Sequence, residues 1–457
     1  MTYLGNSPTT QSFIAGTDYF NGTGSATAFT LSRSVVSVND IQATVNNVVQ
    51  VPNDAYTVSG TTITFTSAPS AGTNNVYVRY LSTTTQSITP SQNTVSYSTL
   101  NSDNQSKLGI SFKNRIINGA MTIWQRGTSA SLSGTNTFSA DRWAAYCSTG
   151  TATASQSSDA PTGFVNSYLY TQSSAGTRNT GDYYEIYQKI EGYNIADLNL
   201  GTANAKTFTL SFWAKSSVTG VYSAVLKNSA TTYQNYVSTY TITAANTWQQ
   251  FSITIPGSTA GTWNTTNGSG LELWLDLGSG ATYQTSTLNS WITGNSNALS
   301  ASTQVGFAQT AGATFQFTGV QLEVGTQATT FDYRSYGTEL SLCQRYFYLH
   351  ASGTMRSGSV YTAIMNSAQW STTTSYGYVQ FPTTMRSTPT VYQNTGTAYY
   401  ILYAGGATQN VSSFSLQDGG PTSVIIWGSN SGSVTVGTAG WVETSNASAL
   451  LGFNAEL

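Results

Sequence analysis

The stretch from Gly270 to Gly278 alternates without a break between leucines and other residues. Its odd-numbered positions are leucines, and the positions between them hold Glu272, Trp274 and Asp276. Successive side chains of a β-strand point to opposite faces, so this pattern predicts a strand whose leucine face lies in a core. The opposite face carries a tryptophan between two acids and points away from that core.

The same alternation recurs through residues 113–336. The residues expected to point inward are Phe208, Leu210, Phe212, Phe251, Ile253, Ile255, Val320, Leu322 and Val324. Trp213 and Lys215 fall on the other side of their strand. Many alternating strands joined by long loops favour a β-sandwich of the jelly-roll type. We therefore expect one central jelly-roll domain over residues 113–336.

Short alternating runs also fill residues 1–82 and 350–457. Two hairpins are expected in the first, one turning at Asn46 and Asn47, the other at Ser59 and Gly60. Residues 83–112 form a connector, in which 98–108 has even odds of being a short helix or irregular chain. Residues 337–349 have helical spacing and form a second connector. The expected fold is all-β, with a small N-terminal sandwich or barrel, a central jelly roll and a C-terminal β-sandwich.

Composition narrows the possible partners. Only 7% of residues are charged, the net charge is −2 and the cations are not clustered, so we expect no nucleic-acid partner. Cys147 and Cys343 lie far apart without metal-ligand spacing, which predicts two free structural thiols, no metal and no cofactor. No signal peptide and no apolar run of about 18 residues is found, so we expect synthesis in a cytoplasm and no membrane insertion.

Rare charges gather between Lys113 and Trp143. We call residues 113–143 the collar, and expect it to be a structural junction before the jelly roll. Asp141 is expected to form a partly buried ion pair with Arg126 or Arg142 that sets domain orientation. Two tryptophans are expected to pack the seam, either within one chain or between chains. The expected structural residues are Arg115, Asn118, Trp124, Arg126, Asp141, Arg142 and Trp143.

Several motifs resemble those of tailed-bacteriophage fibre and tail proteins that carry a jelly roll like a carbohydrate-binding module. The collar motif reads Asn114-Arg-Ile-Ile-Asn-Gly119, then Trp124-Gln-Arg-Gly127, then Ala140-Asp-Arg-Trp143. Later matches are Thr318-Gly-Val-Gln-Leu-Glu-Val-Gly325, Phe331-Asp-Tyr-Arg-Ser-Tyr336 and Phe381-Pro-Thr-Thr-Met-Arg-Ser-Thr-Pro-Thr390. The resemblance covers most of the chain.

This resemblance implies a homotrimeric virion fibre. The N-terminal domain would attach to other virion proteins, and the C-terminal domain would face outward at the virion surface. The implied partner outside the particle is a host surface polysaccharide or lipopolysaccharide. A head decoration or protrusion fibre built from the same modules is the alternative within this class.

Catalytic residues are not expected. His350 is the single histidine and lies beside no nucleophile motif. Glycoside cleavage needs two carboxyl groups about 5–9.5 Å apart. Glu272 and Asp276 are four residues apart, about 13 Å along a strand, although Glu185 would be a possible further partner. A polysaccharide depolymerase is kept as the alternative from another class.

Two sets of aromatic residues are candidates for binding. Trp213, Glu272, Trp274 and Asp276 would bind carbohydrate, because aromatic rings stack on sugars and acidic groups orient hydroxyls. The equally supported alternative is that a second sheet, a loop or a neighbouring chain covers these rings. In the C-terminal domain, exposed aromatic residues would bind the receptor: Trp370, Tyr399, Tyr400, Tyr403, Trp427 and Trp441.

Overall fold

The computed structural model describes residues 16–81, 113–230, 232–353 and 362–457. The contacts divide the chain into two units, Met1–Thr99 and Leu100–Leu457, which are described separately. Almost all regular structure is β, as predicted. The run considered for a short helix, 98–108, lies outside the described residues. Within the described residues, no helix is long and apolar enough to span a membrane.

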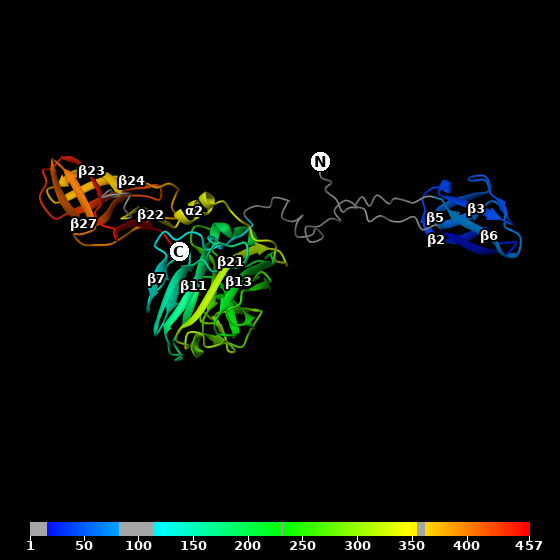
Figure 1. Cartoon of the computed structure of the whole chain (residues 1–457), viewed down its shortest axis with the longest axis horizontal. Coiled ribbons are helices and arrows are strands. Elements are labelled where there is room, and N and C mark those ends of the chain that lie inside the picture. The colour runs from blue at the N-terminus through cyan, green and yellow to red at the C-terminus, as the bar shows by residue number, and fades with distance from the viewer. Residues whose placement is uncertain (1–15, 82–112, 231, 354–361) are drawn as a thin grey trace. The chain divides into compact units, whose positions relative to one another are not determined.

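The N-terminal unit packs a four-stranded sheet, β1-β6-β3-β4, and a β2–β5 pair around one core (Figure 1). Its elements are β1 (Thr17–Gly22), β2 (Ala28–Val35), η1 (Val38–Asp40), β3 (Ile41–Val45), β4 (Val48–Val49), β5 (Tyr56–Phe65) and β6 (Gly72–Tyr80). The first expected hairpin is confirmed, with Asn46 and Asn47 at φ 50° and 65°. The second is wrong, because β5 runs straight through Gly60, whose φ of 58° is accommodated where β2 changes register.

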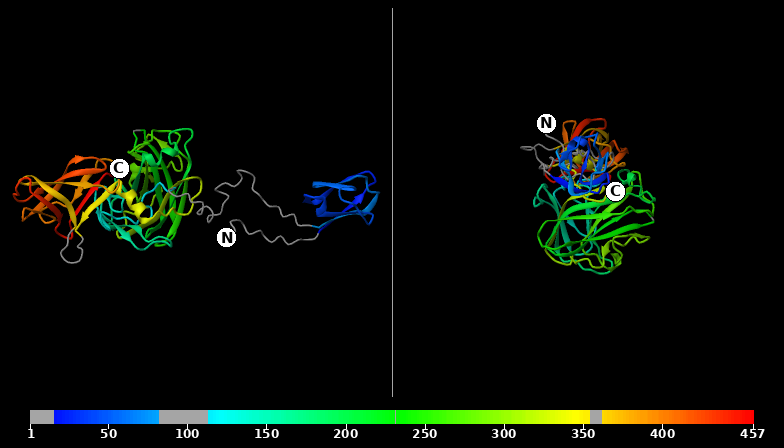
Figure 2. Two further views of the ribbon diagram at one scale, coloured as in Figure 1. Left: turned by 90° about the horizontal axis from the view of Figure 1, so that it is seen from above. Right: turned by 90° about the vertical axis from the view of Figure 1, so that its right-hand side faces the viewer.

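The second unit begins with a sandwich of two antiparallel sheets that lie face to face (Figure 2). The six-stranded sheet, part of which is labelled in Figure 1, has the order β16 (Gln249–Ile255), β13 (Phe208–Ser216), β21 (Ala313–Val324), β11 (Ser167–Ser174), β10 (Thr151–Ser157) and β7 (Ser129–Leu132). The seven-stranded sheet has the order β19 (Trp291–Thr293), β15 (Gln234–Ile242), β14 (Gly220–Lys227), β17 (Ser269–Asp276), β12 (Tyr184–Glu191), β9 (Ala144–Cys147) and β8 (Thr137–Phe138).

The predicted alternation places the core correctly. Leu271, Leu273, Leu275 and Leu277 are buried in one cluster with Phe208, Leu210, Phe212, Val320 and Leu322. Val324 is an exception at the end of β21, where 42% of it is exposed. Short elements in the loops complete the sandwich: η3 (Gly192–Asn194), η4 (Ala196–Leu198), η5 (Ala281–Tyr283), β18 (Gln284–Thr285) and β20 (Ser300–Ala301).

Helix α2 (Tyr336–Gln344) follows the sandwich and is shorter than the predicted helical segment. Cys343, in the last turn of α2, is buried in a small cluster that Leu340 packs against, whereas Phe347 already starts a strand. That strand, β22 (Phe347–Ser352), lies in a three-stranded sheet with β30 (Leu450–Asn454) and β25 (Thr390–Gln393). Both cysteines are free and buried.

The C-terminal part is a closed barrel, where a sandwich was expected. Its strands are β23 (Ala363–Ser371), β24 (Thr374–Gln380), β28 (Ser423–Asn430), β27 (Ala407–Gly419), β26 (Tyr400–Ala404) and β29 (Ala439–Thr444). Because β29 pairs with both β23 and β26, the sheet curls onto itself and leaves no free edge. Sequence alternation specifies which side chains point inward, but it does not specify that closing pair.

Candidate functional site

The outer face of the seven-stranded sheet carries an unusual set of side chains. Because the leucines of β17 point into the core, the residues between them point outward. We define the outer face by the outward residues of β9, β12, β14 and β17: Tyr146, Glu185, Tyr187, Lys189, Lys227, Glu272, Trp274 and Asp276.

Strand register places these residues in rows. Tyr187 lies directly across from Trp274, and Glu185 lies directly across from Asp276. On the other side of Glu185 lies Tyr146 of β9. Side chains directly opposite on antiparallel strands have Cβ atoms about 4.5–5.5 Å apart, so each row is a set of contacting groups.

Two stacked aromatic pairs flank Glu185. The rings of Tyr187 and Trp274 are 4.4 Å apart and nearly parallel, at 14°. Those of Tyr146 and Tyr183 are 4.2 Å apart at 3°. Tyr283, from η5, lies 5.1 Å from Tyr183. The outer face therefore alternates flat aromatic surface with a carboxyl group.

Part of this face is covered, as the alternative interpretation of the sequence anticipated. Ala298 and Leu299, from the loop over the sheet, pack on Val225 and Val237. Trp274 and Tyr283 lie at the margin of that small cluster. The Asp276 carboxylate accepts hydrogen bonds from the backbone of Gly278 and the hydroxyl of Ser300, at 3.0 and 2.9 Å. Asp276 therefore holds the loop in place.

Glu272 is also buried and engaged. It accepts a hydrogen bond from the Trp274 indole nitrogen at 2.8 Å and lies 3.9 Å from the Lys189 ammonium. Lys227 lies over the Trp274 ring, with its nitrogen 4.9 Å from the ring centre. These contacts fix the orientation of the Trp274 ring.

Glu185 differs from both of the other acids. It is 3% exposed, and within the described residues its carboxyl takes part in no hydrogen bond. Burial raises the pKa of Glu185 well above its ordinary value, Asp276 raises it further, and Lys227 opposes the shift. Buried carboxyl groups without partners are rare in native proteins and concentrate at functional sites.

The raised pKa of Glu185 predicts a pH-dependent cost to stability. A carboxyl whose pKa is higher in the folded state favours folding below its unfolded pKa of about 4.3, and this contribution is lost as pH rises. We expect Glu185→Gln to match the wild type near about pH 4 and to become progressively more stable than the wild type as pH rises. Urea unfolding across this range measures the difference. Glu443→Gln, at a half-buried acid on β29, is the matched control and is expected to show no such trend.

Trp213 lies elsewhere. It belongs to β13, in the opposite sheet, and points away from the shared core. Nearby, Lys215 pairs with Asp159 and lies 5.1 Å from the Trp248 ring centre. The four residues expected to bind carbohydrate are thus divided between the two outer faces of the sandwich, with Glu272, Trp274 and Asp276 together on one of them.

The barrel carries two exposed aromatic stacks. Trp370, which is 61% exposed, stacks on Trp427 at 5.9 Å. Trp441, which is 48% exposed, stacks on Tyr403 at 5.0 Å. Tyr399 is half-buried beside the barrel strands. The expectation that Tyr400 is exposed is wrong.

Tyr400 is fully buried, and its hydroxyl donates to the Leu450 carbonyl at 2.6 Å. It is the first residue of β26, and its ring points into the barrel core.

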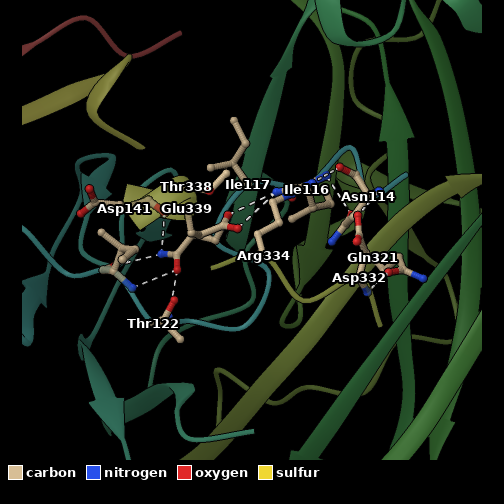
Figure 3. Close-up of polar contacts among 12 residues, drawn as sticks. Asn114, Ile116, Ile117, Thr122, Asp141, Gln321, Asp332, Arg334, Thr338 and Glu339 are labelled. Atoms are coloured by element: carbon tan, nitrogen blue, oxygen red, sulfur yellow. Dashed lines mark hydrogen bonds and ion pairs between the residues drawn. The ribbon is translucent and has the colours of Figure 1, made fainter. Parts of the chain in front are cut away.

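The collar is organised by Asn118. Its buried amide donates to the carbonyls of Ile123 and Asp141 at 2.9 and 3.0 Å, and accepts from the backbone of Thr122 and Ile123 at 2.9 and 3.0 Å. Figure 3 shows this cluster beside Arg334 and Glu339. Asn118 has a φ of 56°, a left-handed conformation that asparagine tolerates.

The collar tryptophans pack within this chain. Trp143 is fully buried against Phe317, with ring centres 5.1 Å apart, and donates to the Asn118 carbonyl. Trp124 packs against Tyr168 at 5.8 Å. Both rings therefore join the collar to the core of the sandwich.

The expected ion pair of Asp141 with an arginine is corrected. Asp141 is fully buried and accepts hydrogen bonds from Gln125, through its backbone at 2.8 Å and through its side chain. Arg126 and Arg142 instead pair with Glu456, Arg126 at 3.3 Å. Near them, Arg345 forms a two-bond pair with Glu191, at 2.6 and 2.8 Å.

We call Arg126, Arg142, Glu191, Arg345, Arg386 and Glu456 the joint. Arg386 donates to the carbonyls of Ala455 and Glu456 at 2.7 and 2.9 Å. The joint connects the collar and β12 to α2 and the last strand, so the collar contacts the C-terminal part of the chain. Arg115 lies outside the joint and pairs with Asp197 at 2.7 Å.

Other chemistry has little support among the described residues. No group of three His, Cys, Asp or Glu side chains there is arranged to hold a metal ion. The ring of His350 lies 2.7 Å from the Ile364 carbonyl, and burial lowers its pKa. This histidine has a structural partner and lies near no nucleophile motif.

Glu185 was expected from the sequence only as a possible partner acid, and four further residues of this region were not predicted: Tyr146, Tyr183, Tyr187 and Tyr283. The alternation of Ile186 and Ile190 with Glu185, Tyr187 and Lys189 was a signal that these residues share one face. The pairing of β12 with β17, which brings them to Trp274, has no such signal.

Comparisons with known proteins give weak likenesses. No family model and no curated protein matches the chain. A bacteriophage CBA120 tailspike protein 4 domain is 13% identical with TM-score 0.25, covering 47% of this chain and 22% of its own. A family 11 carbohydrate-binding module from Clostridium thermocellum is 10% identical with TM-score 0.22, covering 45% and 98%.

A xylan-binding domain from Paenibacillus barcinonensis is 12% identical with TM-score 0.23, covering 44% of this chain and 95% of its own. Likenesses with TM-scores this low carry no argument about the chain. The account below therefore depends on the strand order and contacts described above.

Proposed function

We propose that this chain is a glycan-binding, structural and adhesive subunit of a bacteriophage virion fibre. The observation that carries the binding role is Glu185, which lies between two aromatic stacks, makes no hydrogen bond within the described residues, and is not among their solvent-excluded atoms without a partner, so a ligand can reach its carboxyl. A bound hydroxyl would supply the missing partner.

The chemistry of the outer face suits a sugar. Aromatic rings pack on the apolar faces of pyranose rings, and polar groups beside them select hydroxyl positions. Trp274 is the more exposed ring of its stacked pair, since Tyr187 is 5% exposed, so the Trp274 indole would make this contact. A carboxyl group accepts hydrogen bonds from sugar hydroxyls, and burial, which raises the pKa of Glu185, favours the form that can also donate one. Lys227 and Lys189 add donors at the same face.

The virion context rests on the motifs of the collar, of β21 and of residues 381–390. They support a homotrimer whose N-terminal domain attaches to other virion proteins and whose remaining domains reach the host surface. The alternative, a head fibre, differs in where that N-terminal domain attaches. Antibody labelling of residues 16–81 on intact particles distinguishes a tail position from a head position.

We propose binding without cleavage. Depolymerase activity remains the second candidate because Glu185 and Asp276 lie directly across from each other. Against it, the Asp276 carboxylate is already engaged by hydrogen bonds from the loop, whereas Glu185 has none. Incubation of the protein with host polysaccharide is expected to leave chain length unchanged, and shortened chains would establish the depolymerase.

Trp274→Ala is expected to weaken glycan binding at least about tenfold, as loss of a central aromatic contact does. Trp213→Ala is the matched control, since it removes the same ring from the opposite sheet. A glycan array followed by host-cell adsorption measures both. Unchanged glycan binding by a correctly folded Trp274→Ala variant would contradict the proposal. If Trp370→Ala or Trp441→Ala abolishes binding instead, the barrel carries the site.

A further inference from the structure

A pocket of about 170 Å³ opens beside the collar, away from the outer face. Its walls come from the loop after Asn118, the loop at Phe164 and residues 331–339. Drug-sized ligands occupy about 300–1,000 Å³, so this collar pocket has room for a ligand of about one ring. Its polar lining residues include Thr122, Asp332, Arg334 and Glu339, which are labelled in Figure 3.

Aromatic rings form the other side of the collar pocket. Phe331 and Tyr333 meet edge to face at 4.8 Å, and Phe164 lies 5.1 Å from Phe331. Tyr336 is 66% exposed and Tyr333 is 59% exposed, although both line the pocket. Exposed rings gathered around a concavity are typical of recognition surfaces.

The charges at the collar pocket do not balance. Arg334 lies 3.3 Å from both carboxylate oxygens of Glu339, so these two groups neutralise each other. Asp332 accepts one hydrogen bond, from the Asn114 backbone at 3.3 Å, and forms no ion pair among the described residues. The pocket therefore presents one uncompensated carboxylate next to aromatic rings.

The start of helix α2 does not supply the missing positive charge. The side chain of Ser335 caps its first turn, and Glu339 lies in that turn. The partial positive charge of the helix end is therefore already matched by an acid of the same helix. The one cation among the described residues of the pocket, Arg334, is paired with Glu339, so the Asp332 carboxylate beside aromatic faces is an environment that attracts an organic ammonium group.

We propose that the collar pocket binds an amino-sugar residue, with its ammonium group on Asp332 and its ring against Tyr333 and Tyr336. The size of the pocket selects a single ring over an oligosaccharide. Thr122 also lines the pocket, and its hydroxyl is a group that a sugar hydroxyl can contact. This site is separate from the outer face, and the inference does not depend on the proposed function.

Titration of the full chain with glucosamine, followed by calorimetry or NMR, tests the inference. Glucosamine is expected to bind, and glucose and N-acetylglucosamine are expected to bind at least about tenfold more weakly because they lack the ammonium group. Raising the salt concentration is expected to weaken glucosamine binding. Equal binding of N-acetylglucosamine, or no binding of glucosamine, would overturn the proposal. Nα-acetyl-lysine amide that binds as well as glucosamine would overturn the sugar assignment.

Two variants localise the site. Asp332→Asn keeps the shape of the side chain and is expected to weaken glucosamine binding at least about tenfold. Asp418→Asn, at an exposed acid of the barrel, is the matched control and is expected to change nothing. Tyr336→Ala removes an exposed ring without disturbing the core and is expected to weaken binding as well. Unchanged binding by either pocket variant would contradict the proposal.

Discussion

Glu456→Gln is expected to lower the free energy of unfolding of the second unit by about 3–5 kcal/mol. The Glu456 carboxylate pairs with both Arg126 and Arg142, and all three side chains are at most 5% exposed. Removing its charge leaves two buried guanidinium groups without their ion-pair partner, although Asp141 near Arg126 and Glu191 near Arg142 keep part of the attraction. Burial already lowers the pKa of Arg126 to about 10, which reflects how unfavourable its charge is there.

Urea unfolding, followed by tryptophan fluorescence and circular dichroism, measures this loss. Glu443→Gln, on β29, is the matched control, because no ion pair of Glu443 occurs among the described residues. The combination Arg126→Met, Arg142→Met and Glu456→Leu is expected to recover most of the stability, since apolar replacement of a whole buried ion network is often neutral. If Glu456→Gln lowers the free energy of unfolding by less than about 1 kcal/mol, the joint does not stabilise the contact of the collar and β12 with α2 and the last strand.

Asn118→Ala is expected to cost more than about 4 kcal/mol. The buried amide of Asn118 bonds to two backbone N–H groups and two carbonyls, and among the described residues only the Ile123 carbonyl has a second partner, the Asp141 N–H at 3.0 Å. Each unsatisfied buried group costs about 1–3 kcal/mol. Because Trp143 also donates to the Asn118 carbonyl, the change reaches the core of the sandwich.

Asn246→Ala separates the two causes of that loss. Asn246 has nearly the same left-handed φ, 53°, but it is exposed. Its replacement therefore measures the backbone cost alone, about 1 kcal/mol. If Asn118→Ala loses no more stability than Asn246→Ala, the hydrogen bonds of the collar contribute nothing, and our description of the collar fails.

Short-range patterns predicted the core well. The leucines of β17 and the Phe208–Phe212 run point inward as expected, because alternation alone decides which face is buried. The Asn46–Asn47 turn could be predicted from the sequence because asparagine tolerates a positive φ. Gly60 also has a positive φ, and a turn was wrongly predicted there. A glycine in a strand can accommodate a register shift instead of turning the chain.

Contacts between residues far apart in the sequence could not be predicted from local sequence patterns. Glu456 is 314 residues from Arg142, and no local pattern links them. The expected partner, Asp141, is next to Arg142 in sequence, but adjacent residues of the collar point in different directions. The prediction of a C-terminal sandwich was wrong for the same reason. Closure of the barrel depends on the pairing of β23 with β29, two strands far apart in the sequence.

Part of the candidate site on the outer face could be predicted from the sequence. Trp274 and its two acids share a strand, so their common face followed from alternation. Trp213 satisfied the same rule on its own strand, yet it lies on the other sheet. Glu185 reaches Trp274 through strand pairing, and its lack of a hydrogen-bond partner is a property of the folded chain alone.

The central claim is that the outer face around Glu185 holds a sugar. A crystal structure of the full chain with a glycan identified on the array tests it most directly. We predict a pyranose ring against the exposed part of Trp274, with a hydroxyl within hydrogen-bond distance of the Glu185 carboxyl. A glycan bound only on the barrel, or only on the face that carries Trp213, would contradict the account.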